Sequence, residues 1–154
     1  MRTLSLLQPW ASLVVMGVKT IETRRWQTSH RGPMLIHAGQ RKAGGLIAAE
    51  PPILKYIPHF NQLPFGAIIG QVTLTDIMLV ENLHLSETEI ARQSLELNAF
   101  GDESINRYAW LLEDAITFTR PIPARGHLHL WQFTIESPGV SQQASENGNV
   151  ADDG

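Results

Sequence analysis

Apolar and polar positions along the chain alternate in short runs, and this pattern predicts a small mixed domain. Runs of β-branched and apolar residues bounded by glycine, proline or polar residues are typical of strands. We expect strands over residues 3–7, 20–26, 34–38, 67–80, 108–118 and 128–135. We expect helices over residues 10–16, 41–50 and 86–98. Five or six mostly antiparallel strands with two or three flanking helices predict an α+β fold around a small, curved, partly closed sheet.

Proline and glycine mark where several of these elements begin or end. Pro9 suits the first turn of the first helix, and Gly17 suits the left-handed position just beyond its end. The prolines at 51–52 should stop the second helix. Gly66 and Gly70 are expected bend or bulge sites at and within the long strand 67–80.

The chain of 154 residues fits one domain followed by a polar tail. We expect the domain to span residues 1–136. Residues 137–154 are rich in Ser, Gln, Asn and Gly and hold few apolar residues. Such a segment cannot bury enough apolar surface to order itself, so we expect it to be disordered.

Composition narrows the class of protein. Hydrophobic residues make up 43% of the chain, which is enough for a core, and there is no cysteine for disulfides or thiolate chemistry. No apolar run approaches the roughly 18 residues that span a bilayer. The N-terminus runs into a strand-like segment without the pattern of a signal peptide. We therefore expect a cytoplasmic protein with no membrane partner and no cofactor, and a monomer.

The formal net charge of −3 hides an uneven distribution. Residues 1–55 carry eight Lys or Arg against two Glu, whereas residues 56–136 carry four basic against ten acidic residues. The tail holds three acidic residues and no basic one. A basic N-terminal third can form a face that attracts phosphates. Alternatively, the two halves neutralise each other in the fold, and the sequence leaves both readings open.

Charge gathers most densely just after the first predicted helix. Gly17 is followed by Lys19, Glu22 and Arg24, and on a strand Glu22, Arg24 and Trp26 share one face. The Arg24 fork suits a phosphate or a base edge, and an indole can stack on a base. Lys19, at the turn, can reach the same cleft. The alternative is structural: a Glu22–Arg24 ion pair that braces a sheet, with Lys19 solvated.

Other candidates carry weaker signals. His127 and His129 would share a strand face, and with His37 they could form a metal site, but no acidic residue has matching spacing, so we expect none. His37, between two apolar residues, suits a hydrogen-bonded position in the lining of a cleft. Glu113 and Asp114 are adjacent on a strand, so one must point inward or bend the register.

The charged segment resembles the ASCH domain, the family named for homology to activating signal cointegrator 1. The pattern G-x-K-x-x-E-x-R is that family's signature, and its four positions are Gly17, Lys19, Glu22 and Arg24. Segments with the same resemblance extend from about residue 3 to residue 135. They are 4–13, 26–38, 66–70, 108–110 and 121–131.

The resemblance implies a PUA-like fold, a small pseudo-barrel with flanking helices, and an RNA or nucleic-acid association through a cleft near the signature. The residues it points to for a bound RNA or nucleotide-like ligand are Gln8, Trp10, Lys19, Glu22, Arg24, Trp26 and His37. Lys19 and Glu22 are also the candidates for a catalytic role.

One branch of the family implies an enzyme instead. Its small amidohydrolases remove the acetyl group from N4-acetylcytidine with the motif lysine, a threonine three residues later and a glutamate from a later strand. Lys19 matches the lysine, but Glu22 occupies the threonine position, so the triad is incomplete here. We expect a ligand-binding module. The alternatives are a hydrolase that uses Lys19, on acylated cytidine or of ribonuclease type, and an adaptor domain in transcription or translation regulation.

Overall fold

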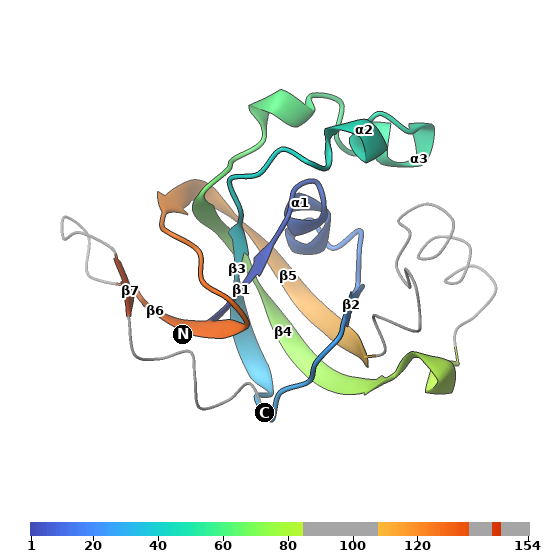
Figure 1. Cartoon of the computed structure of the whole chain (residues 1–154), viewed down its shortest axis with the longest axis vertical. Coiled ribbons are helices and arrows are strands. Elements are labelled where there is room, and N and C mark those ends of the chain that lie inside the picture. Colours follow the sequence, from blue (N-terminus) through green and yellow to red (C-terminus); the bar gives the residue numbers. More distant parts are fainter. Residues whose placement is uncertain (85–107, 136–142, 146–154) are drawn as a thin grey trace.

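The computed structural model describes residues 1–84, 108–135 and 143–145, and its strands form one sheet (Figure 1). The sheet order is β2-β5-β4-β3-β1-β6-β7. The strands are β1 (Arg2–Leu6), β2 (Ile21–Arg24), β3 (Gly32–Ala38), β4 (Ala67–Leu79), β5 (Tyr108–Pro123), β6 (Leu130–Thr134) and β7 (Gln143–Ser145). The predicted helix over residues 86–98 lies outside the described residues.

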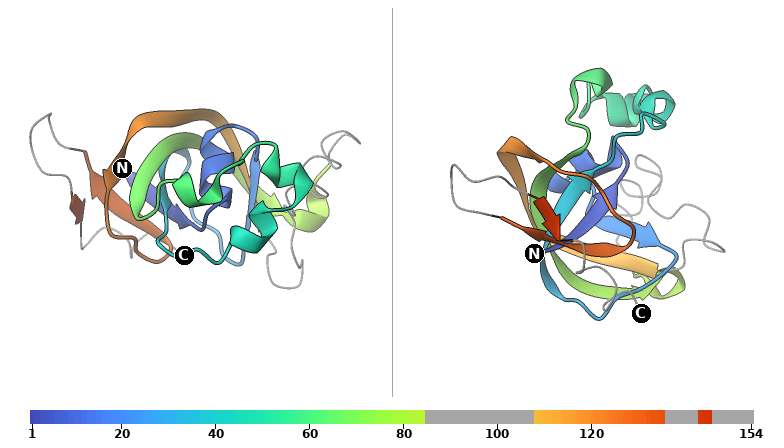
Figure 2. Two further views of the ribbon diagram at one scale, coloured as in Figure 1. Left: turned by 90° about the horizontal axis from the view of Figure 1, so that it is seen from above. Right: turned by 60° about the vertical axis from the view of Figure 1, so that its left-hand side comes forward.

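The sheet is mixed but mostly antiparallel. Only β1 and β3 pair in parallel among the described strands. The register between β4 and β5 shifts three times, and such bulges bend and twist a strand pair. Figure 2 shows both long strands curving around α1. The predicted α+β class with a small barrel-like sheet is confirmed. The short β7, which pairs with β6, lies in the segment predicted as a tail.

Short helices occupy one side of this curved sheet. They are α1 (Trp10–Val15), α2 (Gly45–Ala48) and α3 (Pro51–Leu54), with the 3-10 turn η1 (Phe60–Gln62). A second 3-10 turn, η2 (Val80–Asn82), follows the C-terminal end of β4 and lies away from α2 and α3 (Figure 1). Helix α1 lies in the hollow of the sheet, and α2 and α3 lie beyond it (Figure 1). The five consecutive α1 residues from Ala11 to Val15 are at most 6% exposed. Helix α1 therefore fills the core between β1, β3, β4 and β5.

The second predicted helix is much shorter than expected. Only residues 45–48 are helical, and α3 starts at the prolines predicted to end it. A Cβ at Gly44 would lie 2.0 Å from the carbonyl oxygen of Gln8. This glycine therefore permits a close backbone contact, and its low helix propensity accounts for the shortened helix.

Two other glycines behave as their positions predict. Gly17 follows α1 with φ +76, in the left-handed region that favours glycine. Gly70 lies at a register shift, where a Cβ would approach the Ile116 carbonyl oxygen to 2.2 Å and Val15 Cγ1 to 2.6 Å. This glycine lets α1 and β5 both contact β4.

The histidine pair was predicted wrongly. The last predicted strand begins at Leu130 rather than residue 128, so His127 and His129 precede it, and His129 has φ +57. Within the described residues, no three His, Asp or Glu side chains gather as a metal site. No helix in the part of the chain that the structure describes is long and apolar enough to cross a membrane.

Candidate functional site

The turn after α1 delivers Lys19 into the protein interior. The backbone N–H groups of Val18 and Lys19 both donate to the Leu13 carbonyl, at 3.1 and 3.0 Å. This double contact closes the end of α1 and directs the chain into β2, an edge strand of the sheet. Lys19 is 3% exposed, so its ammonium does not reach solvent as a surface lysine does.

Lys19 and Glu22 form a buried ion pair. Lys19 Nζ lies 3.2 Å from Glu22 Oε2 and also donates to the carbonyl oxygen of Ile21. Burial lowers the pKa of Lys19, Glu22 opposes this effect by favouring the charged form, and Arg24 adds to the lowering. The predicted alternative of a Glu22–Arg24 ion pair is wrong, because the carboxylate pairs with the lysine instead.

Arg24 extends from the motif strand to β1. Its Nη2 donates to the Ser5 carbonyl oxygen at 2.9 Å, while its buried Nε has no hydrogen-bond partner. Beyond Leu4, β1 has no partner in β6, so the Ser5 carbonyl is available to a side chain. A buried donor without a partner carries a desolvation penalty that an added acceptor would remove.

Two aromatic candidates and Gln8 are mainly packing or capping groups. Trp26 lies beyond β2 and makes edge contacts with Trp110 and His129, each at 4.8 Å between ring centroids. Trp10 packs in a small cluster with Leu13 and neighbours from α2 and α3. Buried Gln8 accepts from the Ser12 N–H at 3.0 Å and donates to the Pro64 carbonyl at 2.9 Å.

His37, 2% exposed, forms a polar contact with Ser5 on the neighbouring strand. Its Nδ1 lies 3.0 Å from Ser5 Oγ, and its Nε2 lies 2.7 Å from the Ala124 carbonyl oxygen. Burial lowers the pKa of His37, the hydrogen bond to Ala124 opposes this, and nearby His127 lowers it further.

These two residues open into a cavity of about 790 Å³, here called the Ser5 cavity. It is lined by Ser5, His37, Gly39, Gln40, Gly66, Pro123, Ala124, Arg125, Gly126, His127 and Leu128. Among the residues that the structure describes, this lining contains a guanidinium and two imidazoles but no carboxylate. Arg24 contacts its edge through the Ser5 carbonyl, so the motif strand is connected to it.

A second cavity, of about 340 Å³, lies between α1, residues 56–64 and β5. Its lining is mainly apolar, and Gly17, Lys19, Glu22 and Arg24 are not part of it. Glu113 and Asp114, of which one was expected to point inward or bend the register, are both exposed and line neither cavity. They lie where the β4–β5 register shifts, and Asp114 has φ +52, so the bend predicted as one alternative is present.

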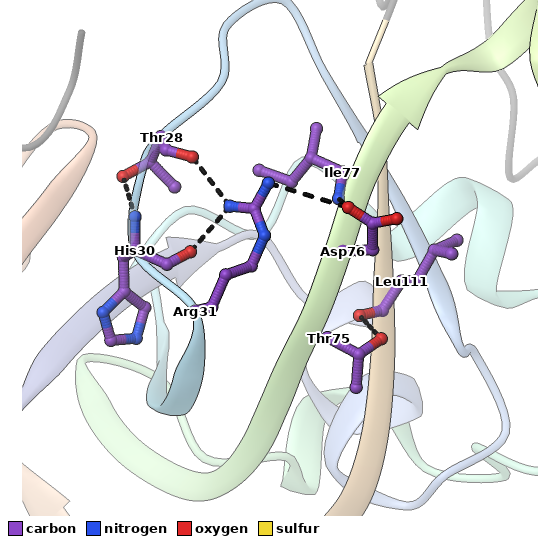
Figure 3. Close-up of polar contacts among 7 residues, drawn as sticks. All are labelled: Thr28, His30, Arg31, Thr75, Asp76, Ile77 and Leu111. Carbon is purple, nitrogen blue, oxygen red and sulfur yellow. Dashed lines mark hydrogen bonds and ion pairs between the residues drawn. The ribbon is translucent and has the colours of Figure 1, made fainter.

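The basic N-terminal third interacts with the acidic half at one surface site (Figure 3). Arg31 donates to the carbonyls of Thr28 and His30, both at 2.8 Å, and lies 3.8 Å from Asp76 on β4. Here the two halves do pair, as one reading of the charge distribution expected.

Sequence reasoning missed Ser5, Arg125 and Gly126 as cavity residues. Ser5 had a usable signal, since a polar residue between Leu4 and Leu6 on a strand faces the side opposite to these two leucines. Arg125 and Gly126 lie in a segment that resembles the family, but their place beside the cavity depends on where β5 ends. The arrangement as a whole offers one buried ion pair, one arginine with a spare donor, and a cationic cavity with a bonded Ser–His pair.

Comparison with known proteins agrees with the signature. The ASCH domain family profile matches residues 4–122. Activating signal cointegrator 1 of Homo sapiens is 28% identical over 136 residues, and the Mus musculus protein is 27% identical. Each match covers 84% of this chain but only 22% of the relative.

Solved structures give weaker matches. Crystal structures of ASCH from Zymomonas mobilis and of a point mutant are each 22% identical, with TM-scores of 0.45 and 0.44. Each match covers 79% of this chain, and 72% and 74% of those chains. The extent of the family match and the complete signature lead to one conclusion: this chain belongs to the ASCH domain family and has its PUA-like fold.

Proposed function

We propose that this ASCH domain binds RNA or a nucleotide-like ligand in the Ser5 cavity. The observation that carries the proposal is the hydrogen bond from Arg24 Nη2 to the Ser5 carbonyl, which connects the signature strand to that cavity. The α1 cavity, as we call the second one, has no such connection among the described residues. A ligand site built on the signature is therefore best located at the Ser5 cavity.

The charge of the Ser5 cavity supports an anionic ligand. Arg125, which is exposed, and His127 both line it, and within the described part of the chain no carboxylate does. A guanidinium binds phosphate oxygens through two parallel donors. The volume of about 790 Å³ also falls within the roughly 300–1,000 Å³ of small-molecule sites.

The signature residues take different roles in this proposal. Lys19 and Glu22 are enclosed and paired, so they position β2 and Arg24 rather than contact a phosphate directly. Arg24 is the signature cation nearest to the ligand, because its Nη2 donates to the backbone carbonyl of the cavity residue Ser5. Trp26 and His129 form an aromatic edge beside β2.

Fluorescence anisotropy with a labelled single-stranded RNA of about ten nucleotides tests the proposal. We expect Arg125→Ala and Arg24→Ala to weaken binding, and Arg125→Ala to reduce the slope of log affinity against log salt by about one. Arg31→Ala is the matched control, because it removes the same charge at the surface pair with Asp76.

Equal weakening by all three variants would indicate unspecific charge attraction and contradict a site in the Ser5 cavity. Turnover of acylated cytidine or cleavage of the RNA that is lost in Lys19→Ala would favour the hydrolase alternative. In that case the enclosed ammonium must become accessible, since it now bonds Glu22 and Ile21. If the protein binds another protein but has no affinity for RNA, the adaptor alternative is favoured.

A further inference from the structure

Ser5 and His37 are held face to face by the parallel pairing of β1 and β3. They are direct partners in the strand register, and Ser5 Oγ lies 3.0 Å from His37 Nδ1. The proposed RNA site does not require the Ser5–His37 contact, because arginine side chains bind the phosphate in that proposal. The pair is therefore a separate chemical feature of the same cavity.

The surrounding hydrogen bonds determine the direction of the Ser5–His37 bond. A backbone carbonyl only accepts, so the 2.7 Å contact with Ala124 places the imidazole proton on Nε2. Nδ1 then presents a lone pair, and the Ser5 hydroxyl donates to it. Because burial lowers the pKa of His37, the ring is neutral and able to take a proton near pH 7.

The serine oxygen is positioned from a third side. Trp131 Nε1 donates to Ser5 Oγ at 3.1 Å, and Trp131 itself is completely buried. A hydroxyl that donates to a histidine, whose other nitrogen is oriented by an acceptor, is the arrangement of base-assisted nucleophilic catalysis. Here the orienting acceptor is the Ala124 carbonyl instead of a carboxylate.

Where the Ser5 cavity reaches the Ser5–His37 pair, its lining residue is Gly126, which has no side chain. A Cβ on Gly126 would lie 2.7 Å from His37 Cε1 and 3.0 Å from Ser5 Oγ. Glycine thus keeps the space beside the hydroxyl clear of side-chain atoms. Arg125 and His127, on either side of Gly126, place cationic or neutral donors in the same lining.

We propose that Ser5 is a nucleophile, with His37 as its base, toward a carboxylic ester that carries an anionic group. Ser5 Oγ attacks the carbonyl carbon while its proton moves to His37 Nδ1. The adduct expels the alcohol, which takes that proton, and the acyl group remains on Ser5. Water then attacks the acyl carbon, gives its proton to His37, and Ser5 leaves with that proton, so ester and water become acid and alcohol.

The test uses the full chain with two chromogenic esters, neutral 4-nitrophenyl acetate and anionic mono-4-nitrophenyl succinate. We expect release of 4-nitrophenolate and, by peptide mapping after acid quenching, a succinyl adduct on Ser5. Ser5→Ala should lose the adduct, and His37→Gln should slow acylation by about 100-fold or more. Arg125→Ala should lower the preference for the succinate ester about fivefold.

Ser29→Ala is the control, since Ser29 is exposed on the turn before β3 and lines neither cavity. Adduct mapping on the wild-type chain keeps the proposal falsifiable even where Ser5→Ala does not fold. Absence of an adduct on Ser5, or an unchanged rate in folded Ser5→Ala, would overturn it. Either result leaves RNA affinity, measured separately, as the test of the proposed function.

Discussion

The ion pairs Lys19–Glu22 and Arg31–Asp76 have similar chemistry and opposite surroundings. Lys19 and Glu22 are 3.2 Å apart, with side chains only 4% and 12% exposed. Arg31 and Asp76 are 3.8 Å apart, with side chains 40% and 57% exposed (Figure 3). Exposed pairs contribute little to stability, whereas a buried charge that loses its partner is strongly destabilising.

The difference in exposure indicates that the Lys19–Glu22 pair holds the signature segment in place, whereas the Arg31–Asp76 pair is a surface contact. The buried pair ties the turn after α1 to edge strand β2, because Lys19 also donates to Ile21. The exposed pair joins a surface turn to β4, but Arg31 has two further carbonyl acceptors.

The largest effect is expected from Lys19→Met. This change leaves the Glu22 carboxylate buried without its cation and removes the donor to the Ile21 carbonyl. We expect a loss of about 3–5 kcal/mol in the free energy of unfolding, measured by urea denaturation at pH 7. Lys42→Met is the matched control: Lys42 is exposed over the Phe65 ring, and its loss should cost less than about 1 kcal/mol. Equal effects of the two variants would contradict the comparison.

The double variant Lys19→Met with Glu22→Leu should be less destabilised than Lys19→Met alone. Removing both charges abolishes the unpaired buried carboxylate, and apolar replacements of buried pairs are often near neutral. We expect it to recover at least about 2 kcal/mol relative to the single variant. A double variant as unstable as the sum of the two single variants would show that the pair acts through packing rather than charge.

His37 extends the comparison to a buried group without a charged partner. Its pKa in the folded state lies below the ordinary 6.5 because of burial, so only the unfolded chain takes up this proton as the pH first falls below 6.5. Stability from this group is therefore complete above 6.5 and declines toward the lower folded pKa, by at most about 1.4 kcal/mol per pH unit. Urea denaturation between pH 7.5 and 5 should show a steeper decline for wild type than for His37→Gln, and parallel curves would refute this.

The smallest effect is expected at the exposed pair. Asp76→Asn removes the charge but keeps an oxygen for the 2.8 Å hydrogen bond from the Ile77 N–H. We expect a change within about 0.5 kcal/mol, which decreases further in 1 M salt because exposed charges are screened. A loss comparable to that of Lys19→Met would remove the distinction between the two pairs.

Local signals in the sequence predicted part of this structure well. Pro9, Gly17 and the apolar run between them predicted α1 because capping and turn chemistry depend on adjacent residues. Gly70 was expected as a bulge site, and the register does shift there. The signature itself predicted the family, which the comparison confirmed.

Long-range features were less accessible. Strand β5 continues to Pro123, five residues beyond its predicted end, because β4 pairs with it over its whole length. This extension moves Arg125 and Gly126 to the Ser5 cavity and keeps His127 and His129 out of β6. The burial of Lys19 was likewise not foreseen, since a lysine after a glycine turn is expected at the surface.

The order of residues alone accounts for α1 and its glycine end, for the strand-forming segments, and for the charges at Lys19, Glu22 and Arg24. These depend on backbone preferences and spacing within a few residues. The tertiary fold adds which charges meet and which of them water reaches. Ser5 and His37 are 32 residues apart and become partners only through the parallel pairing of β1 and β3. Sheet order and packing set such contacts and their burial, and both arise from the whole chain folding together.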